Sequence, residues 1–141
     1  MREILFRGKP VGGAWNTDWV YGAFCPQNSK GNIPCIIVYN GKVAGHRFEV
    51  IPETVGQYTG LTDKNGTKIF EGDIIEHHTQ GDIIVDRGVV NWDGESARWA
   101  YQLNTMNPCF ALYKPDFSEV IGNIHNNPEL IGGEQCTLGK S

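Results

Sequence analysis

The chain has 141 residues and a mass of 15.7 kDa, which suits one compact domain or two small lobes rather than a multidomain machine. Hydrophobic residues make up 40% and charged residues 20%, and 18 glycines and 7 prolines interrupt the sequence, a composition typical of a turn-rich β protein. The net charge of −4 disfavours non-specific binding to nucleic acid or anionic lipid, because both are negatively charged.

The N-terminus and the cysteines favour a cytoplasmic protein. Charges interrupt the apolar run Met1–Arg7, unlike a secretory signal, and no segment has the ~20 apolar residues of a transmembrane helix. Without export, we expect thiols rather than disulfides at the four cysteines, Cys25, Cys35, Cys109 and Cys136. Zinc bound by Cys25, Cys35 and His46 is the alternative, but structural zinc sites use more tightly spaced ligand pairs.

The N-terminal third predicts an antiparallel β-meander. Arg2–Arg7 alternates well enough to form a first strand, and Trp19–Phe24 is rich in the aromatic and β-branched residues that favour a second. Two further strands are expected at Ile33–Tyr39 and Lys42–Ile51. They flank Asn40-Gly41, the preferred pair for a two-residue type I′ turn, because both turn positions need positive φ.

The middle of the chain predicts short elements joined by tight turns. Pro52–Thr54 starts a turn or a single helical turn, and Gln57–Leu61 is extended. Asp63–Gly66 predicts a second hairpin-type turn that leads into Thr67–Ile75, where Glu71-Gly72-Asp73 forms a bend.

The C-terminal part has the same alternation of short strands and turns. Turns that recur every ~8–12 residues favour a small barrel or sandwich. Five short strands are expected there, at Phe70–Glu76, Gly88–Trp92, Ala97–Leu103, Phe110–Tyr113 and Glu119–Ile124. Gly88 predicts a kink and Asp93-Gly94 a turn. Asn127 as cap and Pro128 at the first position predict one or two helical turns.

Three segments carry a resemblance to a known family. The central one is VGQYTGLTDKNGTKIFEGDII, at Val55–Ile75, with Trp19-Val20-Tyr21-Gly22 before it and Val120–Ile124 after it. With these motifs the chain resembles the YopX family of phage and prophage proteins over nearly its whole length. The resemblance implies a C-terminal SH3-type barrel, a bacterial host cell and an unknown function, and it implies no catalytic residues.

We therefore predict a mostly β fold, in which N-terminal antiparallel hairpins join a C-terminal SH3-like barrel that ends in one short helical turn. The expected divisions are an N-terminal sheet lobe at residues 1–55, a barrel lobe at 56–131 and a flexible tail at 132–141.

The sequence contains no catalytic constellation. Asp63–Gly66 has its glycine at position four, whereas a calcium-binding loop needs it at position six. Glu71 and Asp73 flank a glycine, which favours a turn over a carboxylate pair. His77 and His78 are adjacent and therefore point to opposite faces of a strand. We expect no enzyme activity, no cofactor and no metal.

The remaining candidates for a binding surface are aromatic residues and arginines of the predicted barrel, namely Trp92, Arg98, Arg87, Trp99 and Tyr101. On a strand Trp99 and Tyr101 share one face and Arg98 takes the other. Aromatics of this kind stack nucleobases or dock peptides. The interpretation we favour is that they form the barrel core, with Trp92 beside the Asp93-Gly94 turn as the exception.

These observations favour a non-enzymatic accessory protein that binds a macromolecule. An unknown protein partner or self-association is preferred, because acidic charge disfavours nucleic acid and extended strands can pair across subunits. A nucleic-acid-binding module that uses the barrel aromatics and arginines is the alternative, and it predicts salt-sensitive binding. We expect no membrane partner.

Overall fold

The computed structural model describes residues 3–12, 19–26, 33–38, 45–79, 81, 83–103, 110–112 and 117–131. In this part of the chain the structure is mostly β, with two antiparallel sheets and isolated 3₁₀ turns, as predicted. The Cα positions divide into two compact units, Met1–Gly60 and Leu61–Ser141. The division expected at residue 55 stays a prediction, and the expected tail lies outside the described residues.

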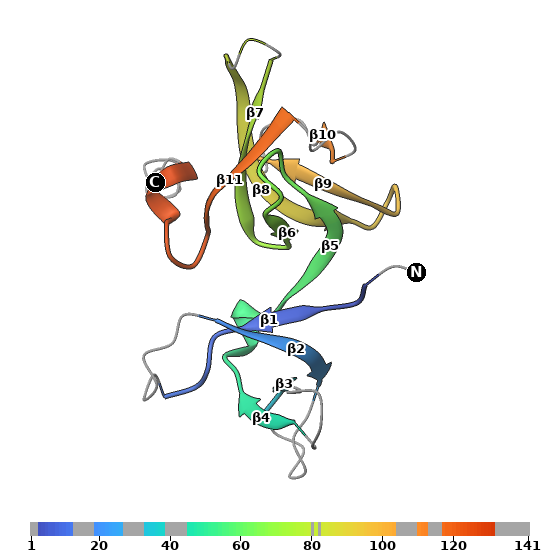
Figure 1. The fold of residues 1–141 in the computed structure, drawn as a ribbon, viewed down its shortest axis with the longest axis vertical. Coiled ribbons are helices and arrows are strands. Elements are labelled where there is room, and N and C mark those ends of the chain that lie inside the picture. The colour runs from blue at the N-terminus through green and yellow to red at the C-terminus, as the bar shows by residue number, and fades with distance from the viewer. Residues whose placement is uncertain are drawn as a thin grey trace. The chain divides into compact units, whose positions relative to one another are not determined.

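The first sheet contains six strands: β1 (Phe6–Gly8), β2 (Val20–Cys25), β3 (Cys35–Val38), β4 (His46–Glu49), β5 (Gly56–Thr62) and β6 (Lys68–Phe70). Their spatial order is β4-β3-β2-β1-β5-β6. Figure 1 shows that β1 to β4 follow one another as a meander, which confirms the antiparallel hairpins predicted for this region. The division between the two units falls within β5.

The register of β3 and β4 differs from the prediction. A two-residue turn at Asn40-Gly41 would pair Val38 with Val43, but its partner is His46, so seven residues, 39–45, separate the two. The observed register places Phe48 opposite the fully buried Ile36, where the predicted one would have placed a glycine. The observed register gives Ile36 an apolar partner, which favours it over the predicted one. The predicted turn itself lies outside the described residues.

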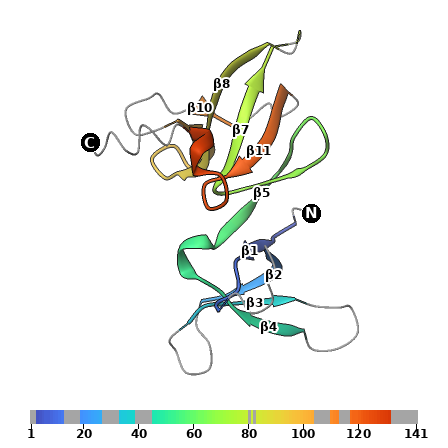
Figure 2. The same ribbon diagram turned by 90° about the vertical axis from the view of Figure 1, so that its left-hand side faces the viewer.

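The second sheet contains five strands: β7 (Asp73–His78), β8 (Ile84–Asp93), β9 (Arg98–Gln102), β10 (Phe110–Ala111) and β11 (Ser118–Asn123). Their order is β10-β9-β8-β7-β11, so the last strand returns to pair with the first (Figure 2). All five predicted strands are present. Within the described residues neither sheet closes into a barrel, and the SH3-like detail of the prediction is not confirmed.

Two 3₁₀ helices complete the described structure, η1 (Pro52–Thr54) and η3 (Pro128–Ile131). Each begins with proline, whose ring fixes φ near the helical value and whose missing N–H would have no partner in the first turn. The helical turns predicted at these two positions are confirmed.

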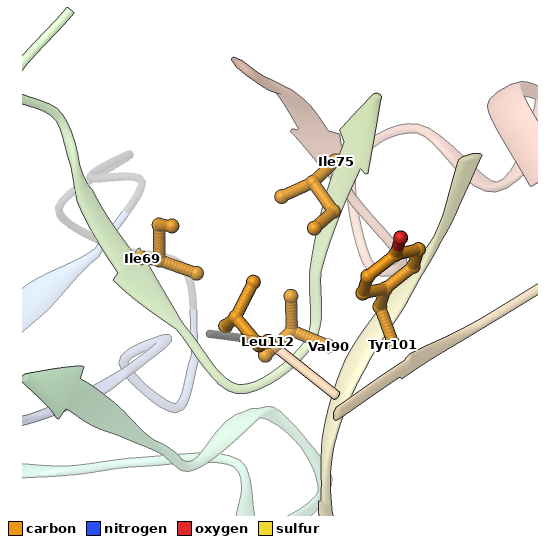
Figure 3. Packing of buried hydrophobic residues seen from close by; sticks show 5 residues of the cluster. All are labelled: Ile69, Ile75, Val90, Tyr101 and Leu112. Atoms are coloured by element: carbon orange, nitrogen blue, oxygen red, sulfur yellow. The ribbon is translucent and has the colours of Figure 1, made fainter. Parts of the chain in front are cut away.

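Five buried side chains form the hydrophobic core of the second unit: Ile69, Ile75, Val90, Tyr101 and Leu112. Figure 3 shows these side chains pointing toward one another. Four of them lie on β6, β7, β8 and β9, and Leu112 follows β10. They can meet on one side because alternate residues of a strand share a face. Burying an apolar side chain of this size contributes roughly 1.5–3 kcal/mol, so this cluster contributes substantially to the stability of the unit.

The predicted turn at Asp63 is confirmed and also fixes a distant strand. One carboxylate oxygen of Asp63, Oδ1, accepts hydrogen bonds from the backbone N–H of Asn65 at 2.8 Å and of Thr67 at 2.9 Å. The other, Oδ2, accepts one from Val120 of β11 at 2.9 Å. Gly66 has φ +83°, a conformation that suits glycine. This buried carboxylate therefore has a structural role.

The kink predicted at Gly88 is not accompanied by a break in strand pairing, and it stays a prediction. The register between β7 and β8 is unbroken at Gly88, and the irregularity lies at Val85, between the pairs His77 with Asp86 and His78 with Ile84. Glycine is needed at position 88 because a Cβ there would lie 2.8 Å from the backbone nitrogen of Gln102. The residue therefore marks a close approach between β8 and the end of β9.

We expect Gly88→Ala to lower the free energy of unfolding by about 1–3 kcal/mol, because the added methyl overpacks against the backbone of Gln102. Gly94→Ala is the matched control, since a Cβ there meets no atom within 4 Å. Urea unfolding of both variants measures the difference. Equal loss of stability in the two proteins would contradict the close approach.

We expect Gly66→Val to lower the free energy of unfolding by about 1–2 kcal/mol, because a β-branched residue is strained at φ +83°. A Cβ at this position meets no atom within 4 Å, so the loss would come from the backbone alone. Gly66→Asn should keep most of the stability, since asparagine tolerates this conformation. A Gly66→Val protein as stable as the parent in thermal unfolding would refute the strain.

Candidate functional site

Four aromatic side chains follow one face of the second sheet, and we call them the aromatic row: Trp92, Trp99, Tyr101 and Phe110. The register places Trp92 opposite Trp99 and Phe110 opposite Tyr101. Residues opposite each other in an antiparallel pair share a face, and so do residues two apart on one strand. This face is the one that carries the core residue Val90, which is the partner of Tyr101.

The rings of the aromatic row touch in pairs. Trp92 and Trp99 meet edge to face, with centroids 5.2 Å apart and planes at 75°. Tyr101 and Phe110 lie 5.6 Å apart, and His77 of β7 stacks on Tyr101 at 6.4 Å. All three distances fall within the ~4.5–7 Å range of favourable aromatic pairs, so the rings hold one another in place.

Burial changes along the aromatic row. Tyr101 is 6% exposed and belongs to the core, and Trp99 packs against that core while partly exposed. Trp92 is 50% exposed and Phe110 44% exposed. The middle of the row is therefore interior, and its ends present ordered aromatic surface to solvent.

The structure does not bring the two predicted arginines to the aromatic row. Both lie on the opposite face of the sheet, since Arg98 precedes Trp99 on β9 and Arg87 is three residues from Val90 on β8. Arg87 donates to a carboxylate oxygen of Glu76 and, at 2.7 Å, to the carbonyl of Leu130. Arg98 donates to a carboxylate oxygen of Asp93 at 3.2 Å, so both arginines pair with carboxylates of the second sheet.

A cluster of charged side chains surrounds Glu76, and the sequence analysis missed it. His78 is buried, with Nε2 3.4 Å from Glu76 Oε1 and Nδ1 3.2 Å from the Lys64 ammonium. Lys64 also lies 3.9 Å from Glu119 Oε1. Burial raises the pKa of Glu76, but the hydrogen bonds from Arg87 and His78 outweigh it and hold that pKa below its usual value. The only sequence signal was the spacing of Glu76 and His78, two apart on a strand.

A pocket of about 650 Å³ lies at the end of the β8–β9 hairpin. It is lined by Asn91, Trp92, Asp93, Gly94, Glu95 and Gln102. Desolvation raises the pKa of Asp93, but the hydrogen bond from Arg98, at 3.2 Å, and the N–H groups of Ser96 and Glu95 hold it below its usual value. Asp93 is therefore ionised at neutral pH. The side chains of Asn91, Asp93 and Gln102 lie on the face of the sheet opposite to the Trp92 ring, so the pocket is polar.

Ser118 and His77 are residue types that take part in nucleophilic catalysis when they are accessible. Ser118 approaches His77 Nδ1 at 3.4 Å but is only 1% exposed, so this pair offers no accessible nucleophile. Within the described residues, no group of three or more His, Cys, Asp or Glu side chains is arranged to hold a metal ion. No helix in the same part of the chain is long and apolar enough to span a membrane.

The cysteine positions test the zinc alternative. Cys25 and Cys35 face each other across β2 and β3, and neither forms a disulfide in this structure. The thiol state of the cysteines stays a prediction. His46 lies opposite Val38, three residues along β3 from Cys35, so it does not join the two thiols. Cys109 and Cys136 lie outside the described residues.

The comparisons with known proteins place the chain in a family. Residues 15–132 match the family model described as YopX protein. The chain belongs to the YopX family. The crystal structure of protein EF1440 from Enterococcus faecalis is similar over 93% of this chain and 99% of that chain, with 24% sequence identity and a TM-score of 0.53. At this identity the likeness shows the fold alone. A comparison with curated proteins found no match.

The part of the chain that matches the YopX family contains the whole candidate site. It begins before β2 and ends just after η3, so the aromatic row, the pocket and the Glu76 cluster all fall inside it. The family assignment therefore covers the elements that hold the site.

We expect Glu76→Gln to make the stability of this YopX protein less dependent on pH in the acid range. Because the folded-state pKa of Glu76 is depressed, its carboxylate stabilises the fold above the unfolded-state pKa, and this contribution is lost as pH falls through the folded-state pKa. Thermal unfolding between about pH 7 and about pH 3 should therefore show a smaller loss of stability in Glu76→Gln than in the parent protein.

Glu53→Gln is the control, because Glu53 is exposed in η1 and lies outside the cluster. Its stability should fall with acid as the parent's does. The role assigned to Glu76 would be contradicted by parallel pH profiles for the parent protein and Glu76→Gln.

Proposed function

We propose that this YopX-family chain is a non-enzymatic accessory protein of a phage or prophage, which acts in the bacterial cytoplasm by binding another protein. The binding surface is the exposed end of the aromatic row. One observation carries the proposal: Trp92 is half exposed, and its ring is held edge-on by Trp99. Tryptophans are enriched among the residues that dominate binding energy at interfaces.

The fixed positions of the rings in the aromatic row favour binding. A side chain that is fixed before binding loses little conformational freedom in the complex, whereas a mobile one loses about 0.5–1.5 kcal/mol. Trp92 is fixed by Trp99, which in turn packs against the core around Tyr101. The row therefore behaves as a rigid anchor, which a partner contacts without reordering it.

Charge favours a protein over a nucleic acid as the partner. The unit Leu61–Ser141 contains twelve acidic residues against six basic ones, so it repels a phosphate backbone. The arginines expected to contact phosphate, Arg87 and Arg98, form ion pairs with Glu76 and Asp93. Because both arginines already pair with carboxylates, a phosphate would have to compete for them, and nucleic acid is therefore the second candidate.

Three further features support the rest of the proposal. The pairing of β11 with β7 is the return that a partly open SH3-type barrel requires, and we assign that architecture to the second unit. The thiols of Cys25 and Cys35 suit the reducing cytoplasm. Ser118 is 1% exposed, so its pair with His77 gives no support to hydrolysis as an alternative.

Trp92→Ala should weaken partner binding by about 2 kcal/mol or more, roughly 30-fold in Kd, because it removes the anchor. Tagged protein would be captured from bacterial cells in which the phage or prophage is active, and its co-purifying proteins identified by mass spectrometry. We expect a partner that the parent protein retains and Trp92→Ala loses. If the partner is a second copy of this chain, light scattering after gel filtration should show an oligomer for the parent protein and a monomer for Trp92→Ala.

Tyr21→Ala is the matched control, because Tyr21 is a 44% exposed aromatic on the first sheet. It should retain the partner. Identical partners for Trp92→Ala and Tyr21→Ala would rule out the aromatic row as the binding surface. Tight, salt-sensitive binding of DNA or RNA by the purified parent, measured by fluorescence anisotropy, would favour the nucleic-acid alternative instead.

A further inference from the structure

We propose that Cys25 and Cys35 form a thiol–disulfide exchange site, at which a small-molecule disulfide such as oxidised glutathione converts the two thiols into a reversible cross-strand disulfide. The inference goes beyond the proposed function and does not depend on the aromatic row, because both cysteines lie on the first sheet. The observation that carries it is the register, which pairs Cys25 of β2 directly with Cys35 of β3.

The backbone pairing of β3 sets the separation of the two cysteines. Val50 donates its N–H to the carbonyl of Pro34, so the residues of β3 that bond to β4 alternate from Pro34 onward, and the backbone groups of Cys35 point toward β2. Cys25 and Cys35 thus occupy a pair of the hydrogen-bonded type, in which the Cα atoms are about 5.5 Å apart. A disulfide needs a Cα separation of roughly 4.4–6.8 Å, so the fold already provides it.

The two thiols share one face of the sheet and differ in exposure. Residues opposite each other in an antiparallel pair point to the same side, and on that side the neighbours Ala23 and Glu49 are exposed. Cys25 is partly exposed, whereas Cys35 has 0% exposure. Because exchange requires access to the attacking sulfur, Cys25 is the residue that meets the small disulfide, and Cys35 is the residue that closes the bond.

The reaction consists of two exchange steps. The thiolate of Cys25 attacks one sulfur of the small disulfide, and the other half leaves as a thiolate that takes up the proton lost by Cys25. The thiolate of Cys35 then attacks Cys25 Sγ and displaces the second small thiol, which takes up the proton lost by Cys35. The two cysteines are thereby oxidised by two electrons, and the small disulfide is reduced to two thiols. The Cys35 thiol donates to the Ile33 carbonyl at 3.7 Å, and this contact is easily broken because an S–H group is a weak donor.

The strand geometry favours a bond that is readily reduced again. The Cβ atoms of opposite residues lie roughly 4.5–5.5 Å apart, whereas a disulfide holds them about 3.5–4.5 Å apart. β2 and β3 must therefore move slightly closer together at this pair, which strains the bond. Strained disulfides are more easily reduced, and they are the regulatory ones. Reduced glutathione should thus return the pair to thiols.

The test uses purified full-length protein in which Cys109→Ser and Cys136→Ser leave only this pair, and we call it the two-cysteine protein. The folded protein is incubated with oxidised glutathione, remaining thiols are alkylated, and the intact mass identifies the product. We expect a species that has lost two hydrogens and carries neither glutathione nor alkylating agent, and excess reduced glutathione should restore both thiols. A lasting glutathione adduct or a disulfide-linked dimer would overturn the proposal. In the oxidised parent protein, a bond from either cysteine to Cys109 or Cys136, found by peptide mapping, would overturn it as well.

Single substitutions in the two-cysteine protein separate the roles of the two thiols. Cys35→Ser should stop at the glutathione adduct on Cys25, because the thiol that attacks in the second step is missing. Cys25→Ser should react with oxidised glutathione at least about tenfold more slowly, because the remaining thiol is buried. Equal reaction rates for the two variants would contradict the assigned order of attack.

Moving one thiol along β2 gives the matched control. When Cys25→Ser is combined with Ala23→Cys, the new thiol stays on the same exposed face but lies diagonal to Cys35, about 7–8 Å away and out of reach of a disulfide. This variant should accumulate the glutathione adduct, and circular dichroism shows that it is folded. Disulfide formation in the control at the rate of the two-cysteine protein would refute the role of the register. Faster closure in urea than in the folded two-cysteine protein would refute it too.

Discussion

The register of β8 against β9 determines both the core of the second unit and its candidate site. It places Val90 opposite Tyr101 and Trp92 opposite Trp99, so that all four side chains share one face. The first pair is buried in the core, and the second continues the same face toward the hairpin end, where Trp92 becomes exposed. A slip of one residue would turn Val90 outward and bury Asn91, so the core holds Trp92 in position.

The opposite face of the same strands has a different role. Arg87 pairs with Glu76 across β7 and β8, and Arg98 pairs with Asp93 across β8 and β9. In these pairs a positive charge is placed against a carboxylate on a neighbouring strand, which favours the observed register over shifted ones. Since the arginines stabilise strand pairing on this face, the surface left for a partner is the exposed ring of Trp92 on the other face.

Local sequence signals predicted the elements, and long-range contacts decided the rest. Strands rich in β-branched and aromatic residues, and the turn at Asp63 with its glycine, could be located because their signals are local. The register of β3 and β4 could not, since it depends on Phe48 reaching the buried Ile36. The role of Gly88 depends on Gln102, a residue from another strand. The aromatics of the site were predicted, but the Glu76 cluster and the pocket lining require the folded register.

The pair between Arg98 and Asp93 lies on the face of β8 and β9 that points away from the Trp92 ring. Arg98 is exposed, and an ion pair of this kind contributes only about 0–1 kcal/mol, because water screens it. The side chains of Asn91, Asp93 and Gln102 alternate with those of Trp92 and Tyr101, so the polar pocket and the aromatic row occupy opposite faces of one hairpin. A partner that contacts Trp92 therefore meets an aromatic surface, while the carboxylate of Asp93 stays with Arg98.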